Sequence, residues 1–480
     1  MSSPATNLNP SKDLNNLTLP STIGVRDVMV IAWPIMVSML SFTVMNFVNA
    51  LWVGPLGKEA FAAVGLGAVL LYAVHGFGLG ALAGLKIAVS QAHGEGDDEK
   101  ARRLLWQGLR LATLMGLAEL AFIPLGRPLL EALGASHDVA PLAADYFAAR
   151  VVGAVPAFLM TALTQYLQGR SRTRAPMVAM IVANVLNVAL DPLLINGSGG
   201  IDGGVGLIPA MGVAGAGIAA SISFAVGGLF LLGVTWRELK ATARTFERAL
   251  FARIWNLGFP LAGRATLEIA SYLIFQGVLA SVGDAHLAAH VLVVRTISIS
   301  FLPGYAVSEA VAVLVGQAVG ARRLDLVASI RRSGLTIAVT FMCAWGVVFV
   351  LWPEPLAAMH SATLEVKHIA VDLFMVSALF QVADAFAMTA LGILNGAGDT
   401  RFVLYATVSI AWFAKLPLGW ALATHGGLGA VGAWWGIVAE AIVLWAVVAW
   451  RVRSGAWRRA AEAAQASRAS EVVQAEAAAA

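Results

Sequence analysis

Six acidic residues stand inside long apolar stretches of the chain, where an ionised side chain is hardest to accommodate. They are Glu119, Asp191, Glu268, Glu309, Asp384 and Glu440. A charge at the centre of a membrane costs about 2.5–3.5 kcal/mol or more, so it persists only where it is paired or functional. A carboxyl group in such surroundings can take up a proton or bind Na+. These residues are therefore candidates for binding and releasing a cation.

The composition of the chain explains why these stretches must lie in a membrane. Of its 480 residues, 59% are hydrophobic and 12% are charged, and the mean hydropathy is +0.78. An ordinary soluble domain carries about 25% charged residues, so this chain cannot cover a soluble surface. Soluble enzymes, nucleic-acid-binding proteins and disordered proteins are excluded. The only cysteine, Cys343, cannot form a disulfide within the chain.

Twelve apolar runs are long enough to cross a bilayer, which takes about 20 residues. They lie near residues 27–54, 61–92, 104–126, 142–168, 175–196, 211–235, 252–282, 287–319, 328–352, 368–396, 402–424 and 430–452. Their length excludes a β-barrel, and their many glycines and alanines favour close helix packing. We expect an all-α integral membrane protein with twelve transmembrane helices.

The basic residues predict the orientation of these helices. We assign 23 of the 32 Lys and Arg residues to one side of the membrane and three, Lys58, Arg127 and Lys367, to the other. Cytoplasmic loops carry the excess of Lys and Arg. We therefore expect a multi-pass protein of the bacterial inner membrane with both termini in the cytoplasm.

An internal repeat divides the chain into two halves. Pro34 and Pro260 are separated by 226 positions, as are Gln91 and Gln317. Gly169 and Gly396 are separated by 227 positions. Each half contains six spans, an even number, so both halves have the same orientation. We expect two six-helix lobes related by a pseudo-two-fold axis along the membrane normal, as in one class of transporters.

The repeat also predicts the domain boundaries. A polar cytoplasmic N-terminus covers residues 1–26, and an N-terminal lobe with spans 1–6 covers 27–235. A basic cytoplasmic linker covers 236–251. A C-terminal lobe with spans 7–12 covers 252–452, and a cytoplasmic tail covers 453–480.

Short motifs in both halves, taken in order, resemble the multidrug and toxic compound extrusion (MATE) family. In the first half they are Val53–Gly57, Ala62–Gly65, Gly94–Asp97, Asn187–Pro192 and Gly212–Ala216. In the second half they are Leu257–Pro260, Ala288–His290, Gly316-Gln317, Gly320 and Gly396–Arg401. The resemblance covers residues 25–450 and implies two lobes in a V around a central cavity. It also implies export of organic cations or drugs in exchange for H+ or Na+ by alternating access.

The resemblance places acidic coupling residues in the C-terminal lobe at Glu268 and Asp384. We expect these two carboxylates to exchange H+, or to bind Na+. An alternative is a structural salt bridge, because Arg264 precedes Glu268 by one helical turn. Relatives often place a tyrosine one turn before the aspartate, whereas this chain has Phe380, which weakens a sodium site of that kind.

A second polar group lies in the N-terminal half. Asn184, Asn187 and Asp191 share one stripe of a helix, and Pro192 follows. In relatives this stripe contributes to a cation or proton site, often completed by an aspartate in span 1. This chain has Asn49 there, which cannot titrate, so Asp191 is the candidate for cation coupling. Hydrogen bonding between helices is the alternative role for this stripe.

The remaining candidates are weaker. Glu309, which follows Pro303-Gly304, could line the cavity together with Asn49, Asn184, Asn187 and Arg264. Glu119 and Glu440 could face neighbouring helices or the rim, and Lys415 and Arg295 lie deep enough to pair with acids. Met39, Phe42 and Met45 are candidates for contacting an apolar substrate, because methionines and aromatic rings suit adaptable pockets.

Motifs for other kinds of function are absent from the sequence. It contains no nucleotide-binding loop, metalloprotease helix or nucleophile elbow. We therefore expect a secondary antiporter and not an enzyme, with no cofactor beyond the coupling ion. Its partners would be a small amphiphilic substrate and membrane lipid but no nucleic acid, and the chain would act as a monomer. The alternative is a flippase for lipid-linked or anionic amphiphilic substrates, since such proteins share a distant fold and the deep cations would suit them.

Overall fold

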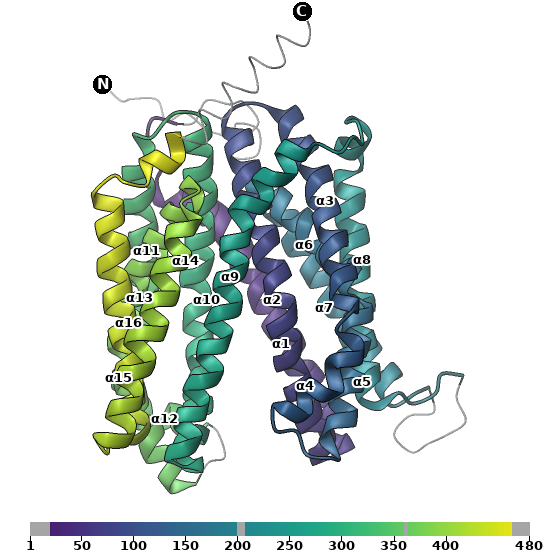
Figure 1. Cartoon of the computed structure of the whole chain (residues 1–480), viewed down its shortest axis with the longest axis vertical. Helices are drawn as coiled ribbons and strands as arrows, with labels where there is room; N and C mark the ends of the chain where they lie inside the picture. The colour runs from purple at the N-terminus through teal and green to yellow at the C-terminus, as the bar shows by residue number, and fades with distance from the viewer. Residues whose placement is uncertain (1–19, 199–206, 360–362, 463–480) are drawn as a thin grey trace, which may run out of the picture.

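The computed structural model describes residues 20–198, 207–359 and 363–462. The described residues form helices joined by short loops (Figure 1). Eleven helices in this part of the chain are long and apolar enough to cross a membrane. A twelfth span is formed by the two helices of 139–169, which meet at a bend of 51°. The prediction of an all-α protein with twelve spans is therefore confirmed.

The first six spans contain eight α-helices. They are α1 (Val25–Val53), α2 (Lys58–Gly94), α3 (Asp98–Leu120), α4 (Gly126–Ala132), α5 (Val139–Val152), α6 (Ala154–Gly169), α7 (Arg174–Ile195) and α8 (Gly212–Lys240). Two 3-10 turns, Gly54–Leu56 and Ile123–Leu125, follow α1 and α3. The span that starts with α3 is broken at the second of these turns and ends with α4.

The last six spans also contain eight α-helices. They are α9 (Arg248–Val282), α10 (Asp284–Gly320), α11 (Leu326–Leu351), α12 (Pro353–Ala358), α13 (Leu364–Ala397), α14 (Thr400–Ile410), α15 (Leu416–Trp420) and α16 (Gly429–Arg453). Two π-helical segments, Ala411–Lys415 and Ala421–His425, interrupt the span formed by α14 and α15. Figure 1 shows α1–α8 on one side of the molecule and α10–α16 on the other, with α9 beside α2.

The two lobes exchange the first turns of one helix each. Val28 and Ile31 of α1 are buried in a hydrophobic core with residues of α10, α11 and α13. Leu250 and Ile254 of α9 are buried in a core with residues of α2, α3 and α6. Each lobe therefore begins with a helix that is anchored on the other lobe.

Helix α8 continues to Lys240 and α9 begins at Arg248, so residues 241–247 join the two helices. This segment lies against α3. Arg103 Nη1 contacts Glu247 Oε2 at 3.0 Å, and Gln107 Nε2 donates to the Thr245 carbonyl at 3.0 Å. The predicted N-terminal segment falls partly, and the C-terminal tail mostly, outside the described residues.

The lobes meet where α2 packs against α9 and α10. Glycines allow the backbones to approach closely. A Cβ atom on Gly84 would lie 2.5 Å from the amide nitrogen of Gly258, and one on Gly94 would lie 2.7 Å from the carbonyl carbon of Gln317. Two glutamines add hydrogen bonds across the interface: Gln91 donates to the carbonyl of Gly396, and Gln317 donates to that of Gly169.

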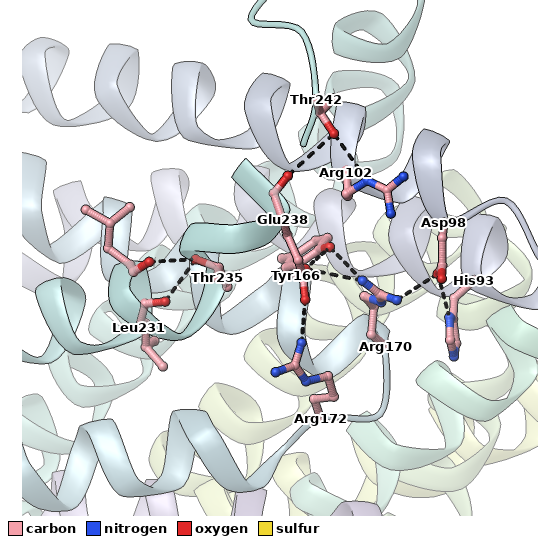
Figure 2. A network of polar contacts seen from close by, with 11 residues as sticks. His93, Asp98, Arg102, Tyr166, Arg170, Arg172, Leu231, Thr235, Glu238 and Thr242 are labelled. Atoms are coloured by element: carbon pink, nitrogen blue, oxygen red, sulfur yellow. Dashed lines mark hydrogen bonds and ion pairs between the residues drawn. The ribbon is translucent and has the colours of Figure 1, made fainter. Parts of the chain in front are cut away.

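We call the end of the molecule where α2, α6, α10 and α13 finish the basic end. Its charged side chains are extensively paired. Glu238 of α8 contacts Arg170 at 3.2 Å and Arg172 at 2.5 Å, and it accepts a hydrogen bond from Tyr166 (Figure 2). Arg170 also contacts Asp98 at 2.7 Å. Burial opposes the charge on Arg170, but Tyr166, Glu238 and Asp98 outweigh it and raise the pKa of Arg170. This network ties α3, α6 and α8 together.

Candidate functional site

A cluster of five charged side chains lies inside the C-terminal lobe. Arg264 and Glu268, one turn apart on α9, form an ion pair with 2.8 Å between Nε and Oε1. Lys415 and Glu440 form a second pair, with 3.2 Å between Nζ and the carboxylate. Asp384 of α13 interacts electrostatically with Glu440, Arg264 and Glu268. Four spans therefore bring these five residues together.

Asp384 differs from the other acids of this cluster. Its side chain is only 7% exposed, and its Oδ2 atom is buried with no hydrogen-bond partner among the described residues. Glu268 and Glu440 each have a basic partner. With three acids and two bases, the cluster carries a formal charge of −1 when all five are ionised. One monovalent cation would neutralise it, and Asp384 offers a free oxygen.

The break in the eleventh span positions Lys415. This residue ends the first π-helical segment, directly before Leu416 and Pro417 of α15. A π-helical turn contains an extra residue, and such turns occur often at functional sites. Trp412 of the same segment donates its indole hydrogen to the Leu267 carbonyl of α9 at 3.3 Å. The irregular turns thus hold Lys415 and its span against the helix that carries Glu268.

The predicted polar stripe of the N-terminal lobe is only partly connected. Asn187 donates to Asp191 Oδ1 at 3.1 Å, and both side chains are fully buried in α7. The Oδ2 atom of Asp191 has no partner among the described residues, and neither does Oδ1 of buried Asn49. Asn184 instead contacts α1, where its amide donates to the Ser41 carbonyl at 2.9 Å. The stripe therefore offers one free carboxylate oxygen, on Asp191.

Glu309 lies at the contact between the lobes. It forms an ion pair with Lys86 of α2, which is only 4% exposed. The two residues are 223 positions apart, so no sequence spacing links them.

The three apolar candidates occupy different surroundings. Met45 is only 1% exposed and belongs to the hydrophobic core of the N-terminal lobe. Met39 is partly buried against the core that α1 shares with α10 and α11. Phe42 is also partly buried. The centroid of its ring lies 6.5 Å from that of Tyr72 and 6.3 Å from that of Phe224. Of the three, Phe42 alone belongs to an aromatic group.

Sequence reasoning did not identify the pair formed by His75 and Glu119. His75 Nδ1 lies 2.9 Å from Glu119 Oε2, between α2 and α3. The sequence marked Glu119 only as a weak candidate and gave no role to His75. Their separation of 44 residues carries no periodic signal, because only the packing of α2 on α3 brings them together.

Comparison with known families places this chain in a family. The family model named MatE matches residues 34–193 and 260–421, one match in each lobe. The chain belongs to the MATE family. It is therefore a membrane transporter of the multidrug efflux type and not an enzyme, and the two matches coincide with the two halves of the internal repeat.

Several MATE relatives match over most of the chain. A probable multidrug resistance protein NorM from Mesorhizobium japonicum is 30% identical over 433 residues, which is 86% of this chain and 90% of the relative. The protein of the same name from Bradyrhizobium diazoefficiens is 30% identical over 420 residues, covering 85% and 88%. The one from Thermotoga maritima is 26% identical over 444 residues, covering 91% and 94%.

Solved structures of MATE transporters share the fold. An outward-facing multidrug resistance MATE transporter of the MOP superfamily superposes with a TM-score of 0.80 at 22% identity, covering 92% of this chain and 99% of that one. A MOP superfamily transporter from Pyrococcus furiosus, described as having a binding pocket of reversed polarity, gives 0.82 at 22% identity, covering 92% and 100%. At this identity the likeness establishes the fold and nothing more about the site.

Proposed function

We propose that this MATE transporter is a secondary antiporter that exports organic cations or drugs in exchange for H+ or Na+. The observation that carries the proposal is the free oxygen of buried Asp384 inside a charge cluster that lacks one positive charge. An intramembrane carboxylate without a partner marks an ion pathway. Binding of one cation at Glu268 and Asp384 would neutralise the cluster, and its release would restore the negative charge.

Coupling requires that the ion and the substrate favour different facing states. When the cation is bound, it neutralises the charge of the Asp384 carboxylate, and Arg264 keeps its ion pair with Glu268. Without it, Asp384 can attract Arg264 or a cationic substrate. Competition for this one negative charge is a physical basis for exchange. A proton needs only one acceptor oxygen, whereas Na+ needs several oxygen ligands, and Arg264 occupies one of the Glu268 oxygens.

The N-terminal lobe offers a second cation site at Asp191. Its free oxygen and its hydrogen bond from Asn187 support that role, while Asn49 and Asn184 would line the polar part of the cavity. We place the apolar part of the substrate against Phe42, where Tyr72 and Phe224 add aromatic surface. Met39 and Met45 would contribute only if α1 rotates, because neither is freely exposed.

We further propose that the basic end faces the cytoplasm of a bacterial cell. The excess of Lys and Arg at this end supports that orientation in the inner membrane, with both termini on the cytoplasmic side. The glycine contacts and the Gln91 bond lie in the second half of α2, next to that end. The Gln317 bond joins the last turn of α10 to the end of α6, also next to that end. In this orientation the lobes are closed toward the cytoplasm. We expect the transporter to act as a monomer, since one chain contains both lobes.

The alternative role as a flippase for lipid-linked or anionic substrates would need basic side chains that are free to bind phosphates. Three of the basic residues within the spans, Arg264, Lys415 and Lys86, are each paired with a carboxylate. Arg295, expected deep in a span, is exposed, and Arg150 has no carboxylate partner among the described residues. The pairing of the first three favours a cationic substrate.

The test uses proteoliposomes with an entrapped fluorescent organic cation. A proton gradient, a sodium gradient or no gradient is imposed on the wild type and on Glu268→Gln and Asp384→Asn. We expect uphill movement with one of the two gradients and its loss in both variants. Glu365→Gln is the matched control, because Glu365 is exposed at the start of the same helix as Asp384.

Uphill transport that survives in both variants would contradict this assignment of the coupling site. Failure of the wild type to move any organic cation, while it moves an anionic amphiphile, would favour the flippase.

A further inference from the structure

Two broken spans meet inside the N-terminal lobe. The third span is interrupted after α3 by the turn Ile123–Leu125, before α4 begins. The fourth is bent by 51° where α5 meets α6 at Gly153. In transporters, interrupted helices commonly form ion and substrate sites, because their free backbone groups must be satisfied within the protein. Here Ser221 of α8 donates to the Ala149 carbonyl at 3.0 Å.

The side chains beside these breaks can exchange protons. His75 of α2 and Glu119 of α3 share a hydrogen bond of 2.9 Å between Nδ1 and Oε2. The imidazole ring is stacked on Phe158 with 4.1 Å between ring centroids, so its orientation is fixed. Glu119 is only 3% exposed, and its Oε1 atom has no partner among the described residues. The carboxylate therefore has one free acceptor.

A positive charge faces the same space. Arg150, in the last turn of α5, has no ion pair within the described part of the chain, and its buried Nε atom has no hydrogen-bond partner there. Its guanidinium lies 5.3 Å from the centroid of the Phe224 ring. A cavity of about 10 Å³, lined by His75, Arg150, Ser221 and Phe224 among others, separates these groups. This is room for about one water molecule.

We propose that His75 and Glu119 form a proton-binding site of the N-terminal lobe, with Arg150 as its charge partner. A neutral imidazole, an ionised Glu119 and Arg150 have a total charge of zero. Uptake of one proton from water converts the imidazole to imidazolium, or the carboxylate to the acid, and its release reverses this. The cavity is too small for an organic solute, and the described residues contain no group of ligands suited to a metal ion. The side chain of His75 is 19% exposed, and the cavity that it lines has room for about one water molecule.

Other ionisable groups near the cavity are few. Tyr72 lies one turn from His75 on α2, and Tyr146 lies one turn from Arg150 on α5. Arg150 interacts electrostatically with both phenols, and Tyr146 also interacts with Asp191 of α7. From α6 and α8 the cavity receives Ala157, Ser221 and Phe224, none of which titrates. The pair is therefore the proton acceptor at this position, and Asp191 is not among the residues that line the cavity.

The pair is confined to one lobe. At the repeat offset of 226 residues, His75 corresponds to Phe301 and Glu119 to Trp345. Conversely, Glu268 corresponds to Phe42 at the same offset. Each lobe thus carries its own acidic cluster where the other lobe has an aromatic ring. If the fold itself required these charged residues, both lobes would carry them at equivalent positions. The fold therefore explains neither the His75–Glu119 pair nor the cluster around Glu268.

The proposal deepens the antiport proposed above and rests on it for a role in transport, but proton binding is tested without transport. Infrared difference spectra between about pH 5 and about pH 8, the range in which histidine changes charge, are recorded on protein in liposomes. We expect a signal of the Glu119 carboxyl group, either its protonation or the shift of its carboxylate bands as the imidazole becomes charged. This signal should be lost in Glu119→Gln and displaced in His75→Gln. Glu131→Gln is the matched control, because Glu131 is an exposed acid of α4 paired with Arg127.

Glu119→Asp serves as the second variant, because it keeps an ionisable group if the amide perturbs folding. We expect it to retain a titrating signal. The proposal would be overturned if the difference spectrum of Glu119→Gln were identical to that of the wild type. It would also be overturned if His75→Gln left the Glu119 signal unchanged. If the wild type shows the coupled signal yet no gradient drives transport, the proton site stands and the antiport proposal fails. If Glu268→Gln abolishes transport while Glu119 never titrates, the antiport stands and this site fails.

Discussion

Gln91 and Gln317 make the same contact in opposite directions across the lobe interface. Gln91 Nε2 donates to the Gly396 carbonyl at 3.2 Å, and Gln317 Nε2 donates to the Gly169 carbonyl at 3.1 Å. The internal repeat relates the two glutamines to each other and the two glycines to each other. Both bonds must break when the lobes separate at the basic end.

We expect the double variant Gln91→Ala/Gln317→Ala to favour the state in which the basic end is open. Each lost bond removes about 1 kcal/mol and leaves a buried carbonyl unpaired, so the two together shift the equilibrium by tenfold or more. The distance between spin labels at the exposed positions Glu99 and Arg331 reports the change, in a Cys343→Ser background. Gln107→Ala, which removes a bond between α3 and the linker, should leave this distance distribution unchanged.

The ion pair between Lys86 and Glu309 should be costly to break from one side. Lys86→Met or Glu309→Gln alone leaves one buried group without its partner, and we expect a loss of about 3 kcal/mol in the stability of the closed lobes. The double variant should lose less, because no unpaired charge remains. Thermal unfolding in detergent measures the cycle. If the double variant loses as much stability as the two single variants added together, the two side chains do not interact.

Gly94→Ala should separate the lobes sterically. Its new Cβ atom would lie 2.7 Å from the carbonyl carbon of Gln317, and backbone cannot yield as a flexible side chain does. We expect the same labels to report a larger distance between the lobes. Gly233→Ala on α8 is the control, since no atom lies within 4 Å of its Cβ position. That control should stabilise the helix by about 0.5–1 kcal/mol without moving the lobes.

Glu440→Gln should weaken binding of the coupling ion at the C-terminal cluster. The substitution removes the single excess negative charge, so the neutral cluster no longer needs a cation. We expect about a tenfold or larger loss of ion affinity, equivalent to about 1.4 kcal/mol. The dependence of transport rate on ion concentration measures this affinity. Lys415→Met should act in the opposite direction, and an effect of the same sign for both variants would argue against charge as the cause.

Sequence reasoning succeeded where the interactions are local along the chain. Hydropathy placed all twelve spans, and one-turn spacing related Arg264 to Glu268, which the structure pairs. The same spacing relates Asn187 to Asp191, and these two residues are also paired.

The sequence did not identify the partners in the pairs that depend on tertiary packing, although it marked Lys415 as deep enough to pair with an acid. Lys415 and Glu440 lie on adjacent spans, His75 and Glu119 are 44 residues apart, and Lys86 meets Glu309 across the lobes. Asn184 shows that residues on the same helix face need not contact the same neighbour. It shares a stripe with Asn187, yet its amide bonds to α1, because a helix face a few residues long can contact two different neighbours.

The exchanged first turns of α1 and α9, together with the reciprocal glutamine contacts, have the form of an isologous interface. In such an interface residue i of one subunit contacts residue j of the other, and j contacts i in return. Two identical six-span chains could therefore assemble through the same contacts, as a two-fold homodimer in the plane of the membrane. Because one chain carries both halves, their sequences need not be identical. One half could then keep Glu268 where the other has Phe42, without altering the surface by which they meet.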